Sequence, residues 1–227
     1  MTDNKPDICS SKLLELIRKH MESGKPDRTK NVFTLSGMPG AGSTEIARIM
    51  AKKLDLKIYN KEFIRDFSEF MGINRSAFDL VSEEKGDAKD FWLYRIFGGG
   101  EVTNEKIRQH LDKFFYALAS MGNCIVVGRG GHVALKDVAT LRVHIVCEKD
   151  VSIKRIMKRN SVSYQEAEQR YKKALASAGR FVWNIYNSRL NEAINFDVVI
   201  NTTKLDDPEY VADMLIEAAQ RRNFGVF

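Results

Sequence analysis

The sequence has few cysteines and histidines, and each shortage excludes a class of protein. Its three cysteines, Cys9, Cys124 and Cys147, lack the paired spacing of a zinc site or a disulfide framework. The last two stand inside apolar runs, so we expect them to be buried, reduced thiols. The four histidines are scattered singly along the chain. We therefore predict no structural metal site.

Long apolar runs are also missing. No stretch reaches the roughly 18 apolar residues that a membrane span needs. The first residues mix acidic and basic side chains without a continuous apolar core, which argues against a signal peptide. We therefore expect a cytoplasmic protein that does not act at a membrane.

What is present is an ordinary globular composition with unevenly placed charge. The 227 residues are 44% hydrophobic and 29% charged, which suits one α/β domain with an insertion. Of the net charge of +6, residues 142–190 carry +7, with eleven Lys or Arg against four acids. This basic segment indicates an anionic partner. A solvated helix face, a phosphate site and a nucleic-acid surface all remain open as explanations.

Five short apolar segments alternate with helical patterns. The predicted strands are residues 31–36, 57–60, 124–128, 141–146 and 197–201. The predicted helices are residues 10–23, 43–54, 61–71, 103–121, 149–159, 164–190 and 208–221. This alternation predicts a parallel sheet covered by helices on both faces. Residues 72–100 have weak periodicity and read as an excursion from that core.

A glycine-rich loop connects the first predicted strand to the next helix. Its residues are Gly37, Met38, Pro39, Gly40, Ala41, Gly42, Ser43 and Thr44. Such a loop turns several N–H groups inward at a helix start, which favours a di- or triphosphate. Ser43 stands where the usual motif has lysine, whereas Thr44 keeps a hydroxyl for Mg²⁺. A simple tight turn between strand and helix is the alternative.

Several arginines are placed where a phosphate would need them. Arg129 directly follows a buried strand, at the sheet edge where α/β proteins bind ligands. Arg155 and Arg159 are four residues apart and share a helix face. Because a guanidinium binds phosphate through two parallel hydrogen bonds, we predict these three as the catalytic cations. Trp183 and Tyr186 are spaced either to stack on a base or to pack in the core.

Together, these stretches resemble the cytidylate kinase-like family, a branch of the P-loop nucleoside monophosphate kinases. The resemblance rests on LSGMPGAGSTEIARIMAKKL with IYNKEFI, on GNCIVVGRGGHVAL, on RIMKRNSVSYQEAEQRYKKALASAGRFVWNIYN and on FDVVINTTKL, in that order over residues 31–205. It implies a P-loop NTPase fold with five parallel strands in the order 2-3-1-4-5. It divides the chain into an N-terminal helix and linker (residues 1–30) and a kinase-like domain (residues 31–227). Within that domain it implies a monophosphate-binding region at residues 63–100 and an arginine-rich helical lid at residues 160–191.

The resemblance also implies roles for single residues. Residues 37–44 would hold ATP, with Mg²⁺ on Thr44, and Arg155 and Arg159 would contact the transferred phosphoryl group. The loop after Thr202 would border the donor adenine.

On the acceptor side, the implied residues are Arg129, Lys173, Ser177 and Arg180. The last three stand where bacterial cytidylate kinases have Arg, Asp and Arg, so the acidic partner of a cytidine nucleotide is replaced by Ser177. Members of this branch often lack the loop lysine and carry Asp where this chain has Asn60.

The leading hypothesis is an Mg²⁺-dependent kinase that moves the ATP γ-phosphoryl group to a nucleoside monophosphate, CMP-like, or to a related small acceptor. A nucleotide-binding regulatory protein with weak or no catalysis is the second, favoured by the missing lysine and aspartate. Nucleic-acid binding through the basic segment is the third and least favoured. The N-terminal helix at residues 10–23 would pack on a second copy of the chain or on its own domain.

Overall fold

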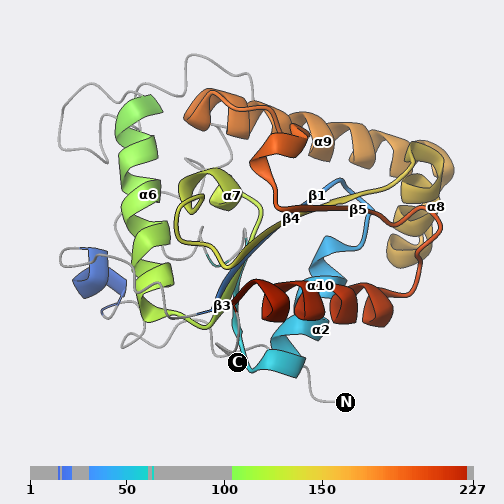
Figure 1. Cartoon of the computed structure of the whole chain (residues 1–227). Coiled ribbons are helices and arrows are strands. Elements are labelled where there is room, and N and C mark those ends of the chain that lie inside the picture. The colour runs from blue at the N-terminus through green and yellow to red at the C-terminus, as the bar shows by residue number, and fades with distance from the viewer. Residues whose placement is uncertain (1–14, 16, 22–30, 61–62, 64–103, 224–227) are drawn as a thin grey trace.

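The predicted parallel sheet is present. The computed structural model describes residues 15, 17–21, 31–60, 63 and 104–223 (Figure 1). Its five parallel strands have the order β2-β3-β1-β4-β5, as the family resemblance implies. The strands are β1 (Val32–Gly37), β2 (Lys57–Tyr59), β3 (Cys124–Val127), β4 (Leu141–Val146) and β5 (Val198–Asn201).

Helices cover both faces of this sheet (Figure 1). One face carries α2 (Ser43–Leu54) and α10 (Pro208–Asn223). The other carries α6 (Asn104–Met121), the short α7 (Gly131–Ala134) and the long α9 (Tyr164–Tyr186). Helix α8 (Lys149–Asn160) follows β4 and packs against α9. Within the described part of the chain, no helix combines the length and the apolar character needed to cross a membrane.

Each face of the sheet has its own hydrophobic core. Met50 and Leu215 are fully buried on the α2–α10 face, and Phe114 and Phe181 on the α6–α9 face. Ile17 is also fully buried in the second of these cores. The described part of the predicted N-terminal helix therefore packs on its own domain.

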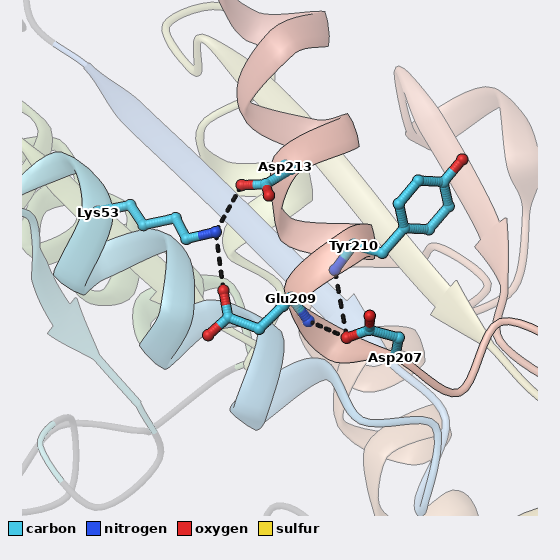
Figure 2. Close-up of polar contacts among 5 residues, drawn as sticks. All are labelled: Lys53, Asp207, Glu209, Tyr210 and Asp213. Atoms are coloured by element: carbon cyan, nitrogen blue, oxygen red, sulfur yellow. Dashed lines mark hydrogen bonds and ion pairs between the residues drawn. The ribbon is translucent and has the colours of Figure 1, made fainter.

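Figure 2 shows how α2 and α10 are joined at the surface. The amine of Lys53 lies 2.7 Å from a carboxylate oxygen of Glu209 and 2.6 Å from one of Asp213. Hydrogen bonds to Asp213 and Glu209 raise the pKa of that amine. The carboxylate of Asp207 accepts from the backbone N–H groups of Glu209, at 2.9 Å, and Tyr210, at 3.4 Å, and so caps α10. The Lys53 contacts thus join α10 to the helix that begins at the glycine loop.

The chain departs from the predicted elements in a few places. The helix predicted for residues 164–190 ends at Tyr186, because Asn187 takes a left-handed conformation and its N–H bonds the carbonyl of Trp183. A 3-10 turn, η1 (Ala193–Asn195), follows it, and neither η1 nor α7 is predicted from the sequence. The predicted helix 61–71 and the region 63–100 lie outside the described residues except for Phe63, which is helical and buried.

Candidate functional site: three pockets around the glycine loop

The glycine loop leaves β1 and turns directly into α2. The Met38 N–H donates to the carbonyl of Ile145 on β4 (2.9 Å), and the Ala41 N–H donates to the carbonyl of Met38 (3.0 Å). Gly42 is the N-cap of α2, with a φ of 93°. The loop therefore leads directly into the start of α2, where the first N–H groups have no partner within the helix, and such a helix N-terminus binds phosphate.

Two of the loop glycines are required by close packing. A Cβ on Gly40 would lie 2.6 Å from the carbonyl oxygen of Ser152 on α8, and the φ of Gly40 is 79°. A Cβ on Gly37 would lie 2.7 Å from the Cβ of Ser43. The loop is thus held closely between α8 and the first turn of α2, and larger residues at these positions would push it open.

A cavity of about 420 Å³ is lined by the glycine loop and by arginine side chains from two helices. Arg159 comes from the end of α8 and Arg170 from α9. Arg170, whose guanidinium lies 2.7 Å from the carboxylate of Glu166, was not assigned to the site from the sequence. The concentration of arginine and lysine in residues 142–190 was the signal that could have indicated it. The lining of this phosphate pocket is Gly37, Met38, Pro39, Gly40, Gly42, Ser43, Thr44, Ile156, Arg159, Asn160, Arg170, Ala174 and Ala178.

Arg155 does not accompany Arg159 into the phosphate pocket. Its guanidinium donates to the Thr202 carbonyl at 2.7 Å and to the Thr202 hydroxyl oxygen at 3.1 Å. That hydroxyl in turn donates to the carbonyl of Ala41 in the loop, at 2.8 Å. The two arginines predicted to act together therefore line separate pockets, because Thr202, directly after β5, binds Arg155.

Arg155 and Thr202 line a second, smaller cavity of about 140 Å³ on the far side of the loop. Leu205 and Pro208 contribute apolar walls to it, and Gly42 belongs to the linings of both this cavity and the phosphate pocket. The cavity lies beside the segment after Thr202, where the sequence predicts the donor adenine.

Arg129 lines a third cavity, of about 240 Å³, beside the carboxyl ends of β1 and β3. Its guanidinium carbon lies 4.8 Å from the centre of the Phe181 ring, a cation–π contact. Ser177 lines the same cavity. Among the described residues, Lys173 and Arg180 lie outside the linings of these three pockets. This cavity and the phosphate pocket share three residues: Gly37, Ala174 and Ala178.

The predicted aromatic pair at the end of α9 separates into two environments. Trp183 has 53% of its surface exposed, whereas Tyr186 is buried in the core. A Cβ on Gly130 would lie 2.3 Å from Cε2 of the Tyr186 ring. Tyr186 therefore packs against the loop that carries Arg129, and Trp183 does not belong to the core.

Two histidines are buried together on the α9 side of the sheet. The rings of His132 and His144 stack on Phe196, with centroid distances of 4.5 Å and 4.6 Å. Burial lowers the pKa of His132 to about 4 and also lowers that of His144. Both imidazoles are therefore neutral at physiological pH and pack as aromatic side chains.

No protein-only metal centre is visible in the described residues, which contain no cluster of three His, Cys, Asp or Glu side chains. The phosphate pocket offers the hydroxyl of Thr44, and none of the described residues that line it is a carboxylate. This donor set suits Mg²⁺, which keeps several water ligands and binds through substrate phosphates.

Part of the charge of the basic segment is neutralised by ion pairs. The amine of Lys149 lies 2.6 Å from a carboxylate oxygen of Glu168, and that of Lys172 lies 3.2 Å from the same atom. The guanidinium of Arg142 lies 2.9 Å from the carboxylate of Asp197. The Lys149–Glu168 pair connects α8 to α9, and the Arg142–Asp197 pair connects β4 to the residue before β5.

A central strand that leads through a glycine loop into a helix, within a parallel sheet of this order, defines a P-loop α/β protein. A solved structure of an uncharacterised protein from Eubacterium ventriosum shares this fold, with a TM-score of 0.57 and 17% identity over 84% of this chain and 99% of that one. Comparison with known families narrows the class further. The chain belongs to the cytidylate kinase-like family, which matches residues 32–204.

Curated relatives cover most of the chain. Cytidylate kinase from Sulfolobus acidocaldarius is 29% identical over 192 residues, which span 83% of this chain and 94% of the relative. Cytidylate kinase from Methanopyrus kandleri is 25% identical over 179 residues, or 78% of this chain and 88% of the relative. The family and these relatives support a phosphotransferase of the kinase type.

Proposed function

We propose that the protein transfers the γ-phosphoryl group of ATP to a nucleoside monophosphate, CMP-like, or to a related small acceptor. The observation that carries this proposal is the shared wall between the phosphate pocket and the Arg129 cavity. Phosphoryl transfer needs an attacking and a leaving oxygen in line on either side of phosphorus. Two adjoining pockets that meet at Gly37 suit a donor phosphate in one and an acceptor phosphate in the other.

Arginines supply the positive charge that the loop lysine would otherwise provide. Arg159 and Arg170 line the phosphate pocket, and Arg129 lines the adjoining cavity. Guanidinium groups placed around the transferred group stabilise the charge spread over its equatorial oxygens. With Ser43 in the lysine position, we expect these three arginines to carry most of that stabilisation.

Thr44 is the described residue that would hold Mg²⁺, through its hydroxyl. When bound, the ion would neutralise part of the charge of the donor phosphates. The chain itself contributes the backbone N–H groups at the start of α2 and the closely packed glycines that fix their direction.

The small cavity beyond the loop suits the donor base. The guanidinium of Arg155 makes two hydrogen bonds to Thr202, and Leu205 and Pro208 provide apolar surface in the same cavity. A planar guanidinium stacks on aromatic rings, so an adenine can lie against Arg155. In this proposal Arg155 stacks on the donor base, while Arg159 binds the donor phosphates.

The acceptor would occupy the cavity beside Arg129, whose lining includes Ser177 but neither Lys173 nor Arg180. The proposal assigns acceptor binding to Arg129 and Ser177, with Lys173 and Arg180 farther along the same helix as the remaining implied residues. Their role in closing over an acceptor stays a prediction.

A direct test uses purified protein with ATP·Mg²⁺ and a panel of nucleoside monophosphates, with ADP formation as the readout. We expect turnover with at least one acceptor, CMP being the first to try. Arg159→Met should lower kcat/KM by about 100-fold or more, because it removes a cation from the transferred group. Lys158→Met is the matched control, since Lys158 is an exposed neighbour in the same last turn of α8 and should change kcat/KM by less than about twofold.

A catalytically weak, nucleotide-binding regulatory protein is the second candidate. It is favoured by Ser43 in the lysine position and by the engagement of Arg155 with Thr202 instead of the phosphate pocket. Calorimetry with ATP and with each monophosphate separates the two. Tight ATP binding without ADP formation from any acceptor would select the regulatory protein, and equal rates for wild type and Arg159→Met would refute the kinase proposal.

A further inference from the structure

The hydroxyl of Thr202 links the end of β5 to the glycine loop. It donates to the carbonyl of Ala41 at 2.8 Å, between residues 161 positions apart, and it accepts from the guanidinium of Arg155 at 3.1 Å. Ala41 and Thr202 have only 1% and 2% of their surfaces exposed. Because a buried carbonyl needs a hydrogen-bond donor, the protein itself must supply one here, and Thr202 does so.

The surrounding hydrogen bonds direct the hydroxyl proton to the loop. A hydroxyl has one proton to donate, and two carbonyl oxygens lie within reach of it, that of Ala41 at 2.8 Å and that of Val146 at 3.2 Å. The Val146 carbonyl already accepts from the backbone N–H of Thr202 at 2.8 Å. Arg155 donates to the hydroxyl oxygen and, at 2.7 Å, to the Thr202 carbonyl. The Ala41 carbonyl is therefore the acceptor of the hydroxyl proton.

The bonded carbonyl belongs to the peptide unit between Ala41 and Gly42. No cis peptide bond occurs in the described residues, and the C=O and N–H groups of a trans peptide unit point in opposite directions. With the Ala41 carbonyl held toward Thr202, the Gly42 N–H points away from Thr202. Thr202 lines the small cavity but not the phosphate pocket, whereas Gly42 lines both. The hydrogen bond thus directs the Gly42 N–H toward the phosphate side of the loop.

Packing alone does not hold this peptide unit in place. A Cβ on Gly40 would lie 2.6 Å from α8, but a Cβ on Gly42 would approach no atom closer than 3.9 Å. Gly42 also has the backbone freedom of a glycine, with a φ of 93°. If the unit rotated, the Ala41 carbonyl oxygen would replace the Gly42 N–H on the phosphate side. An oxygen there repels an anion, whereas an N–H binds it.

We propose that Thr202 is a positioning residue for the donor phosphates, acting through the Ala41–Gly42 peptide unit. Its hydroxyl holds the Ala41 carbonyl away from the phosphate pocket and so keeps the Gly42 N–H available to a bound polyphosphate. This inference rests on the proposed function for the ligand, a nucleoside triphosphate, but its effect on the loop can be measured without that ligand. It gives Thr202 a role beyond lining the donor-base cavity.

The first test compares two ligands, ATP·Mg²⁺ and inorganic tripolyphosphate with Mg²⁺, by calorimetry on the full-length protein. Tripolyphosphate has no base, so it reports on the loop alone. Thr202→Val removes the hydroxyl and keeps the shape of the side chain. We expect the Kd of both ligands to rise about tenfold. A rise for ATP alone would mean that Thr202 acts only on the base, and no rise for either ligand would also overturn the proposal.

Two further variants separate positioning from a general loss of stability. Thr202→Ser keeps the hydroxyl and should leave both Kd values within about twofold of the wild type. Thr140→Val is the matched control, because the buried Thr140 hydroxyl accepts from the Val32 N–H at 3.0 Å, at the opposite end of β1 from the loop. It should lower stability without changing either Kd. Equal weakening of ligand binding in Thr140→Val, or in Thr202→Ser, would contradict the proposed role.

Urea unfolding checks that each variant is folded. If Thr202→Val does not fold, Thr202→Ala is the second substitution that removes the hydroxyl, and the same rise in both Kd values is expected of it.

Hydrogen exchange of the ligand-free protein separates failure of this inference from failure of the proposed function. Mass spectrometry of residues 37–46 reports how often the loop opens. We expect faster exchange there in Thr202→Val and unchanged exchange in Thr202→Ser and Thr140→Val. If the wild type binds neither ligand but this pattern appears, only the proposed function fails. Unchanged exchange in Thr202→Val would refute the positioning role whether or not the protein binds nucleotides.

Discussion

The two ends of helix α9 differ in what they contact. At its start, Ala167 and Tyr171 are buried against α8 in a small cluster, and the remaining side chains form surface ion pairs or face solvent. At its end, Phe181, Val182, Ile185 and Tyr186 are buried in a main core. Between these ends, residues 174–180 contribute no buried side chain.

This difference divides the region that the sequence assigns as one lid at residues 160–191. Buried apolar surface opposes separation from the core, whereas solvated ion pairs contribute little. We therefore predict that the first part of α9, with Arg170, moves more easily relative to the phosphate pocket than the last part does. The last part belongs to the frame that holds Arg129. Four measurements test this division.

The largest expected effect is on global stability. Phe181→Ala should lower the free energy of unfolding by about 3–5 kcal/mol, because it leaves a cavity in the core and removes the support of Arg129. Trp183→Ala, two residues away but 53% exposed, should cost about 1 kcal/mol or less. Urea denaturation of both variants measures the contrast, and similar losses would show that the end of α9 is not part of the core.

We expect the protein to lose stability at low pH because of His132, which lies on the same face of the sheet as the end of α9. The pKa of His132 is lowered to about 4 in the folded protein, chiefly by burial, so the unfolded chain binds its proton more readily. Stability is then fully present above about pH 6.5 and is lost as the pH falls toward 4, by up to about 3 kcal/mol. His132→Phe should flatten this dependence in denaturation curves recorded between pH 7 and 4. An unchanged slope would mean that other groups cause the acid loss.

Replacing either glycine of the Arg129 loop by alanine should lower stability, but by different amounts, although both glycines have left-handed backbone conformations. Gly130→Ala should cost about 2–4 kcal/mol, because the new Cβ meets the Tyr186 ring in addition to the backbone strain. Gly128→Ala should cost only about 1–2 kcal/mol, since nothing lies within 4 Å of its Cβ. Thermal and urea unfolding give both values. Equal losses would exclude the Tyr186 contact as a structural constraint.

The smallest expected change in stability comes from a substitution in the segment between the two ends of α9. Gly179 is helical, and a Cβ there would meet nothing within 4 Å, so Gly179→Ala should stabilise the protein by about 0.5–1 kcal/mol. Hydrogen exchange should slow in residues 174–180 and remain unchanged in residues 181–186. Uniform slowing along α9 would show that the helix opens as one unit.

Short apolar runs were sufficient to predict the sheet. The strands at residues 31–36 and 141–146 are recognisable because buried parallel strands contain continuous Val, Ile and Leu, and the glycine loop is recognisable by its spacing between a strand and a helix. The short helix α7 was not recognisable because four residues carry no periodic pattern.

The arginines show the limit of sequence spacing. Arg155 and Arg159 are correctly placed on one helix, yet Thr202, directly after β5 and 47 residues after Arg155, supplies the hydrogen-bond acceptors that separate them. Arg170 enters the phosphate pocket because α9 packs back along α8, which no local pattern encodes.

The sequence by itself determined the fold class and the position of the glycine loop between β1 and α2, because both depend on local periodicity and on backbone conformations that glycine permits. Only the tertiary structure decided which guanidinium faces which pocket and which part of the predicted lid is buried. Those outcomes depend on hydrogen bonds and packing between residues far apart in the chain, such as Thr202 with Arg155 and Tyr186 with Gly130.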